Sequence, residues 1–198
     1  MKTYLIQQKI TAFVNQYKVF EEAPSNGTNL VAFAQQKRFA FREKFNLFSD
    51  ESQQLPLAEI QARQVLDFGA RYDIRLSNSE TAGVIGKAFG SSLLRSTWNI
   101  YKPGAEDTPI MVVTERNATV AIVRRLWDFI PILSDFPFVL RYHFNYSDPA
   151  TGKVVARLDK TTLIKDHYRL EVEDAGLATT HWVTFVAMGI MLDALQGR

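Results

Sequence analysis

Basic side chains recur at one position of a sequence pattern that is repeated along the chain. Each copy has an apolar residue, two spacers and a basic residue, and then, after a gap, an aromatic residue followed two positions later by an aliphatic one. The basic residues of these copies are Lys9, Lys37, Arg63, Lys87 and Arg157. If the copies occupy equivalent places in space, these charges form a band that attracts anions. We therefore expect a site for an anionic lipid headgroup or a membrane surface.

A second basic stretch lies beside one of these positions. Its members are Arg38, Phe39, Phe41, Arg42, Lys44 and Phe45. Basic residues flanked by apolar ones suit the surface of an anionic membrane, where each charge contributes roughly 1 kcal/mol. Arg38 therefore joins the candidate anion-binding residues. The alternative interpretation is that Lys and Arg keep the outer faces of strands hydrated and protect strand edges from pairing.

Other side chains that could carry chemistry lack the spacing that the chemistry needs. The histidines His143, His167 and His181 do not show the i, i+4 spacing of a helical metal site. Residues 148–153 resemble the end of a phosphate loop, but the upstream glycine is missing and a β-branched pair follows, so we expect a hairpin turn there. The chain has no Gly-x-Ser-x-Gly elbow. We predict no catalytic residue, no metal, no cofactor and no enzymatic activity.

The composition predicts one ordinary globular domain over residues 1–198. The net charge is only +2, which disfavours nucleic-acid binding. The chain has no cysteine, so disulfides and thiol catalysis are excluded. The apolar run near the N-terminus, Tyr4 to Ile6, is too short for the core of a signal peptide. We expect a cytoplasmic protein, with a peripheral membrane location as an option.

The repeated pattern predicts a series of β-hairpins. An aromatic and an aliphatic residue two positions apart lie on one face of a strand, because strand side chains alternate with a period of two. Turn residues such as Pro103-Gly104 separate the copies. The predicted strands are 4–11, 15–21, 30–38, 42–48, 58–66, 70–76, 82–89, 95–101, 109–114, 138–147, 152–158 and 166–173. Since open sheets rarely exceed about ten strands, we expect this antiparallel sheet to close into a barrel.

Two segments have helical character instead. Apolar residues in 117–130 follow helical spacing, and this predicts an amphipathic helix on the outside of the barrel or across one end. In 179–196 the apolar residues point in every direction, which is typical of a helix that is buried or spans a membrane. The uncharged run ends at Asp193 and is shorter than the roughly 20 residues that spanning requires. We therefore predict a central helix that fills the barrel.

The hairpin series and the buried helix together resemble a known family. The segment Tyr4-Leu5-Ile6-Gln7-Gln8-Lys9, the basic-to-aromatic hairpins and the apolar segment 180–193 resemble the LURP-one-related branch of the tubby C-terminal-like superfamily, which includes the phospholipid scramblases. The resemblance implies a closed twelve-stranded β-barrel around a hydrophobic helix, and proteins that are mostly not enzymes. It also implies phosphoinositide binding by tubby-type members and calcium-linked membrane activity of scramblases. This chain has no acidic calcium loop, so calcium-dependent scrambling is not expected.

Three functional hypotheses follow from the sequence. The first is a non-catalytic module that binds anionic phospholipid or the membrane surface. The alternative is a scaffold or protein-interaction domain with no small ligand. A third is a carrier of an apolar ligand, which would require space beside the central helix.

Overall fold

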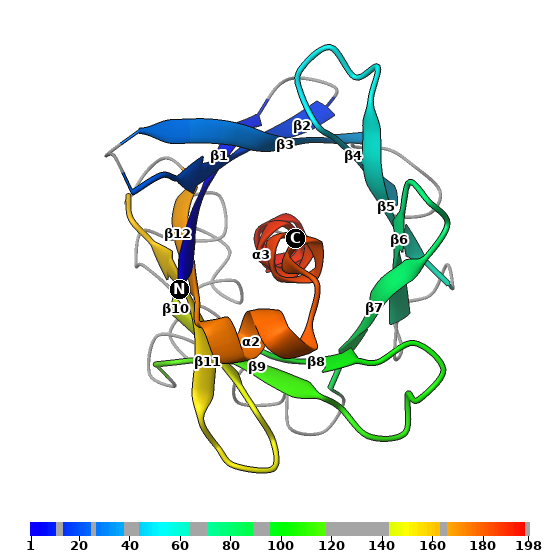
Figure 1. The fold of residues 1–198 in the computed structure, drawn as a ribbon, viewed down its shortest axis with the longest axis vertical. Helices are drawn as coiled ribbons and strands as arrows, with labels where there is room; N and C mark the ends of the chain where they lie inside the picture. Colours follow the sequence, from blue (N-terminus) through cyan, green and yellow to red (C-terminus); the bar gives the residue numbers. More distant parts are fainter. Residues whose placement is uncertain are drawn as a thin grey trace, which may run out of the picture.

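A ring of antiparallel strands surrounds one helix in the computed structural model of the chain (Figure 1). The structure describes residues 1–10, 14–24, 27–37, 44–63, 71–88, 96–117, 143–162 and 166–196. Within these residues the strands form a closed barrel of twelve, as the sequence predicts. The mainly β fold class and the enclosed C-terminal helix are therefore confirmed.

Each predicted strand overlaps an observed one. The strands are β1 (Lys2–Ile10), β2 (Val14–Glu22), β3 (Thr28–Lys37), β4 (Lys44–Phe48), β5 (Pro56–Ala62), β6 (Arg71–Leu76), β7 (Thr81–Lys87), β8 (Thr97–Tyr101), β9 (Met111–Glu115), β10 (His143–Ser147), β11 (Val154–Lys160) and β12 (His167–Val172). The helices are α2 (Asp174–Thr179) and α3 (Trp182–Gln196).

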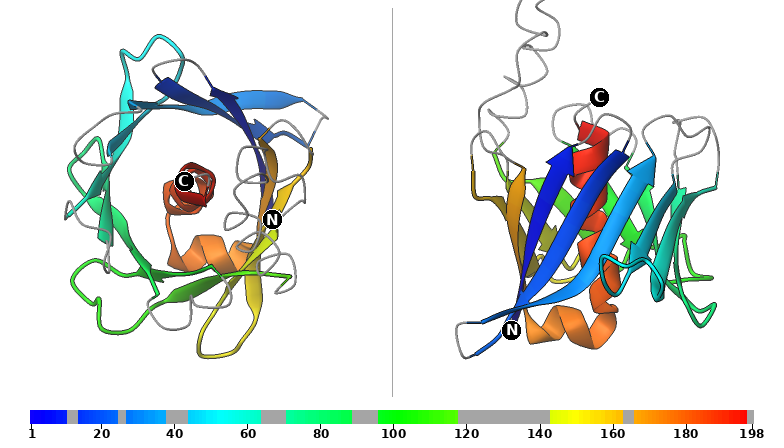
Figure 2. Two further views of the ribbon diagram at one scale, coloured as in Figure 1. Left: turned by 180° about the vertical axis from the view of Figure 1, so that it is seen from behind. Right: turned by 90° about the horizontal axis from the view of Figure 1, so that it is seen from above.

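Every strand pairs with its neighbours in sequence, and β1 pairs with β12 to close the ring. In that closing pair Ile6 lies opposite Tyr168, and on the other side of β1 it lies opposite Val19. Because neighbouring strands are antiparallel, all odd-numbered strands end at one rim, which we call the upper rim. The even-numbered strands end at the other, the lower rim. Helix α3 ends at the upper rim, whereas α2 lies beside the lower rim (Figure 2, right).

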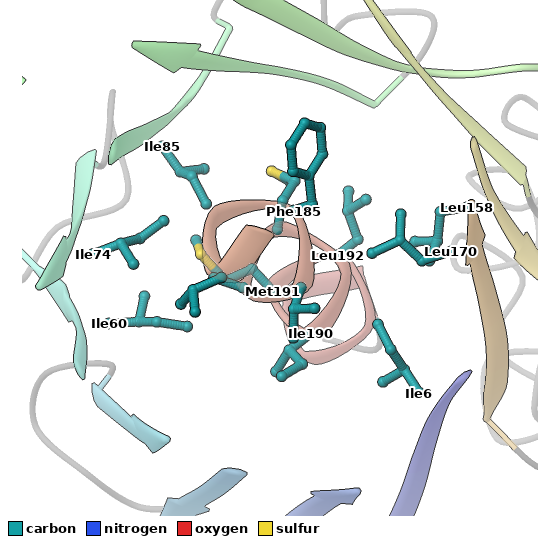
Figure 3. Close-up of a cluster of buried hydrophobic side chains, with 14 of the residues drawn as sticks. Ile6, Ile60, Ile74, Ile85, Leu158, Leu170, Phe185, Ile190, Met191 and Leu192 are labelled. Carbon is teal, nitrogen blue, oxygen red and sulfur yellow. The ribbon is translucent and has the colours of Figure 1, made fainter. Parts of the chain in front are cut away.

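The core is the layer of side chains between α3 and the wall. All residues from Val183 to Leu192 are buried, so α3 has no polar face turned to solvent. Isoleucine and leucine side chains of the strands point at Phe185, Ile190, Met191 and Leu192 from several directions (Figure 3). A twelve-stranded barrel is too wide to be filled by its own inward side chains. The helix supplies the missing apolar volume, which explains why its sequence is apolar on all sides.

Two glycines let the helix approach the wall closely. A Cβ at Gly83 of β7 would lie 2.9 Å from Cγ2 of Thr184, and a Cβ at Gly189 of α3 would lie 2.9 Å from Cδ1 of Ile6. The Thr184 hydroxyl also donates a hydrogen bond of 3.3 Å to the Ala82 carbonyl, which fixes that side chain against β7. These contacts set the position of α3 between β1 and β7.

The predicted helix boundaries need one correction. Helix α3 begins at Trp182, and residues 174–179 form α2, which the sequence did not predict. The chain is extended at Thr180, and the ring nitrogen Nδ1 of His181 accepts a hydrogen bond of 3.3 Å from the Val183 amide, so it satisfies a donor at the start of α3. No helix among the described residues is long and apolar enough to cross a bilayer. The predicted helix 117–130 lies, apart from Asn117, outside the described residues.

We expect Gly83→Ala to destabilise the barrel by about 1–3 kcal/mol, because the new methyl group collides with the stiff Thr184 side chain. Thr184→Ala opens space at the same place, so the double variant should lose less stability than the two single variants together. Urea denaturation of the four proteins measures this coupling. Strictly additive losses would show that the two side chains do not compete for this space.

The hydroxyl of Tyr146 is buried and has no hydrogen-bond partner among the described residues, and its ring packs against Phe185 with centroids 5.8 Å apart. Tyr146→Phe keeps this packing and removes an unpaired polar group, so we expect it to raise the free energy of unfolding by up to about 1 kcal/mol. The matched control is Tyr17→Phe, which should destabilise at neutral pH because the Tyr17 hydroxyl donates to Asp193. Equal losses in both variants, measured by urea denaturation, would contradict this view of Tyr146.

Candidate functional site

Each odd-numbered strand ends within one residue of a basic side chain. In strand order these residues are Lys9, Lys37, Arg63, Lys87, Arg116 and Lys160. Since all odd-numbered strands end at the upper rim, six basic positions gather at one end of the barrel. Four of them are candidates that the sequence indicated.

Arg157 does not belong to this set, and its predicted equivalence to the other basic positions is wrong. It lies in the middle of β11, where it stands opposite Asn145 and Glu171 and is exposed on the outer wall. The residue that ends β11 is Lys160. Val154 and Arg157 have the spacing of the repeated pattern, but β11 continues for three residues beyond Arg157 and ends at Lys160. Alternation along β11 continues through the buried Leu158 to Lys160, and that signal locates the true strand end.

Among the upper-rim cations whose side chains are described, Lys9 and Lys87 are the ones whose charge no nearby carboxylate balances. Lys9 is exposed near the end of β1 and stands opposite Gln16. Lys87 is half-buried, and its ammonium lies 5.8 Å from the centre of the Trp98 ring, within the range of a cation–π contact. Within the described ranges, neither lysine has a carboxylate oxygen within 4.0 Å.

Two further predicted residues can be placed only in part. Lys37 ends β3, where its backbone pairs with Val14 of β2. Arg38 lies outside the described residues, and so do Phe39, Phe41 and Arg42.

The Arg63 side chain forms two ion pairs on the outer wall. Its guanidinium lies 2.6 Å from Asp73 on β6 and 2.6 Å from Glu106 in the segment between β8 and β9. Arg71 also binds Glu106 and stacks over the Tyr101 ring at 4.7 Å. These hydrogen bonds, that of Arg63 first, lower the pKa of the Glu106 carboxyl. Arg63 therefore fastens the segment 102–110 to the wall, and its charge is balanced there.

The two basic residues that the sequence analysis missed are also paired. Arg116 lies 2.9 Å from Asp159 of β11, and the same carboxylate is 2.8 Å from Nδ1 of His143. Lys160 is only 7% exposed, and its ammonium lies 2.6 Å from Asp166. Of the rim cations whose side chains are described, Lys9 and Lys87 are thus the ones available to an external anion.

A buried carboxylate lies on the inner side of the same rim. Asp193, in the last turn of α3, accepts a hydrogen bond of 2.8 Å from the Tyr17 hydroxyl and another from the Tyr168 hydroxyl. Burial is the largest cause that raises its pKa, to about 6. Sequence reasoning treated Asp193 only as the end of an apolar run. Nothing local in the sequence indicates that two distant tyrosines converge on it.

The lower rim has a different character. Its turns contain Asp50 and Asp148, whose carboxylates accept hydrogen bonds from the Ser52 and Ala150 amides. Hydrogen bonds from Ser52, that of its side chain first, lower the pKa of Asp50, and the bond from the Ala150 amide is the largest cause that lowers the pKa of Asp148, so both carboxyls are ionised at neutral pH. A groove of ~520 Å³ between β4, β5 and β6 also lies towards this rim, near the Ser77 turn. These two ionised carboxylates lie at the end of the barrel opposite to the basic strand ends.

Comparison with known proteins identifies a family model that covers most of the chain. A model of the LURP-one-related family matches residues 30–193. The match begins in β3, includes every strand from β4 to β12, and ends at Asp193 in α3. No curated protein matches the chain.

The pairing of Arg63 with Glu106 leads to a testable expectation. Arg63→Gln and Glu106→Gln should each lower stability by less than about 1 kcal/mol, and a double-mutant cycle should show a coupling that shrinks in 1 M salt. Because the pKa of Glu106 is lowered in the fold, its contribution should be present at neutral pH and disappear as the pH falls through that pKa. A coupling that survives high salt and acid would contradict an electrostatic origin.

Proposed function

Since this chain belongs to the LURP-one-related family, we propose that it is a non-catalytic barrel domain that binds anionic lipid headgroups at a membrane surface through its upper rim. The observation that carries the proposal is the basic residue at the end of every odd-numbered strand. In this arrangement the barrel stands end-on, with the upper rim towards the lipid and the turns of Asp50 and Asp148 at the lower rim towards solvent.

Local charge supports this orientation better than net charge does. The whole chain carries only +2, yet the basic strand ends share one rim while the turns of Asp50 and Asp148 occupy the other. A basic group near an anionic surface contributes roughly 1 kcal/mol. Lys9 and Lys87 can supply this energy because the carboxylates of the described residues do not neutralise them. Paired residues such as Arg63 would first have to give up an ion pair.

The sequences of the connections at the two rims also differ. Between the end of β3 and the start of β4, two strand ends at the upper rim, the sequence contains Arg38-Phe39-Ala40-Phe41-Arg42, which lies outside the described residues. The connection from β6 to β7, at the lower rim, reads Ser77-Asn78-Ser79-Glu80. Basic residues next to aromatic ones are typical of segments that contact the membrane interface, whereas short polar turns are typical of contact with water. This contrast in composition supports the upper rim as the lipid side.

The family resemblance adds support of a different kind. Tubby-type proteins, in the wider superfamily that the sequence resembles, bind phosphoinositide headgroups through basic residues. We carry over from them only the class of ligand, an anionic phospholipid, and propose a cytoplasmic protein attached peripherally to the membrane. The alternative of a scaffold domain without a small ligand makes the opposite prediction for acidic lipids, so one experiment separates the two.

Co-sedimentation with vesicles of phosphatidylcholine, with and without phosphatidylglycerol, tests the proposal. We expect binding only to the anionic vesicles and a strong reduction in 0.5 M salt. Lys9→Gln and Lys87→Gln should each weaken binding about three- to fivefold, since each removes roughly 1 kcal/mol of attraction. Urea denaturation should confirm that both variants keep the stability of the parent protein.

Matched controls come from other parts of the barrel. Lys153→Gln removes the same charge from the lower rim, where β11 begins, and Arg157→Gln removes it from the middle of the wall. End-on docking leaves these two variants close to the parent protein in affinity. Equal weakening by the controls would disprove the assignment to the upper rim. Binding that does not depend on acidic lipid would instead favour the scaffold alternative.

A further inference from the structure

The last turn of α3 is tied to the wall through one side chain. Asp193 is the only ionisable residue in α3, whose sequence is otherwise apolar or neutral. Its two tyrosine partners come from β2 and β12, the strands on either side of β1. Between them, the Gln8 side chain of β1 donates a hydrogen bond of 3.0 Å to the Tyr17 hydroxyl. One carboxyl thus joins the end of the helix to adjacent strands.

Two charged groups that face Asp193 act on its pKa in opposite directions. Lys160 of β11 favours the ionised carboxyl, while Asp166, just before β12, opposes it. These two side chains are themselves paired at 2.6 Å. Within the described residues, the groups that face it from the surrounding elements are Tyr17, Tyr168, Lys160 and Asp166.

Burial is the largest influence on the protonation of this carboxyl. The hydroxyls of Tyr17 and Tyr168 stabilise the ionised form, but the loss of hydration outweighs them. A neutral carboxyl fits the interior at a smaller cost in free energy than a carboxylate does. When the last turn leaves the barrel, Asp193 regains its hydration and with it the ordinary preference for the ionised form.

We propose that Asp193 makes the last turn of α3 a proton-linked latch, which is held inside the upper mouth of the barrel when the carboxyl is protonated and opens more readily when it is ionised. The latch is independent of lipid binding. The last turn of α3 would therefore respond to mild acid at the upper rim, where the basic strand ends also lie.

The direction of the pH response follows from the two states of the turn. In the closed turn the pKa of Asp193 is about 6, and in the open turn it returns towards the ordinary value of 3.8. A raised pKa in the closed state means that protons favour closure. The extra stability of the closed turn is complete below pH 4 and is lost as the pH rises through about 6. Between these limits the opening equilibrium should increase ten- to a hundredfold.

Amide hydrogen exchange at residues 193–196, measured between pH 4 and 8 and corrected for the intrinsic exchange rates, tests the latch. In the parent protein we expect the opening equilibrium of the last turn to increase ten- to a hundredfold from pH 4 upwards and to level off above pH 6 to 7. Asp193→Asn keeps the shape and one acceptor oxygen, replaces the other oxygen with a donor, and cannot ionise, so the opening of its last turn should not depend on pH. Asp159→Asn, which removes a carboxyl from the outer wall, should behave as the parent protein does.

A second variant keeps the test decisive if Asp193→Asn fails to fold. Tyr17→Phe removes a hydrogen bond that favours the ionised carboxyl, so it should move the midpoint of the transition to higher pH. Opening of the last turn that is independent of pH in the parent protein, or a midpoint that Tyr17→Phe leaves in place, would overturn the proposal. Vesicle binding plays no part in these readouts, so the lipid proposal can fail or succeed separately.

Discussion

The need to fill a twelve-stranded barrel governs this structure. Inward side chains such as Ile6, Ile60 and Ile74 reach only part of the way to the axis, and helix α3 fills the rest. The helix must be apolar on every side because the wall surrounds it on every side. The same constraint explains the glycines at positions 83 and 189, where wall and helix approach too closely for another side chain. The interior residues thus serve mainly to pack the core, and most polar and charged side chains lie at the rims and on the outer wall.

The sequence predicted the fold well because the fold is encoded locally. Aromatic and aliphatic residues two positions apart mark the inward face of β2, β4, β6, β8 and β12, and the lack of a polar face marks α3. The rim was predicted in part: Lys9, Lys37, Arg63 and Lys87 are strand ends, but Arg157 was mistaken for Lys160. That error arose because spacing alone does not locate where a strand ends. Asp193 and its tyrosines were missed because strand pairing, not proximity in sequence, brings Tyr17 and Tyr168 together.

The outer wall and the upper rim use charge in different ways. On the wall, guanidinium groups meet carboxylates of their own or nearby strands, as Arg169 of β12 meets Glu171 of the same strand and Glu22 of β2. Such pairs hydrate the surface and hold connecting segments in place without leaving much charge for a partner. At the upper rim Arg63, Arg116 and Lys160 are paired as well, whereas Lys9 and Lys87 remain uncompensated by the described carboxylates. A basic residue is therefore informative about function here only when its neighbours are known.

The pairing of β1 with β12 has a consequence for biogenesis. The edge of β1 that receives Tyr168 and Leu170 has no partner until the last strand has been synthesised, and the helix that fills the interior follows even later. During translation the nascent chain is therefore an open sheet with an apolar inner face and an unpaired edge. Contacts so distant in sequence form slowly, and such intermediates are prone to aggregation. Production of this protein in the cell should accordingly depend on chaperones that shield the unfinished sheet until α3 arrives.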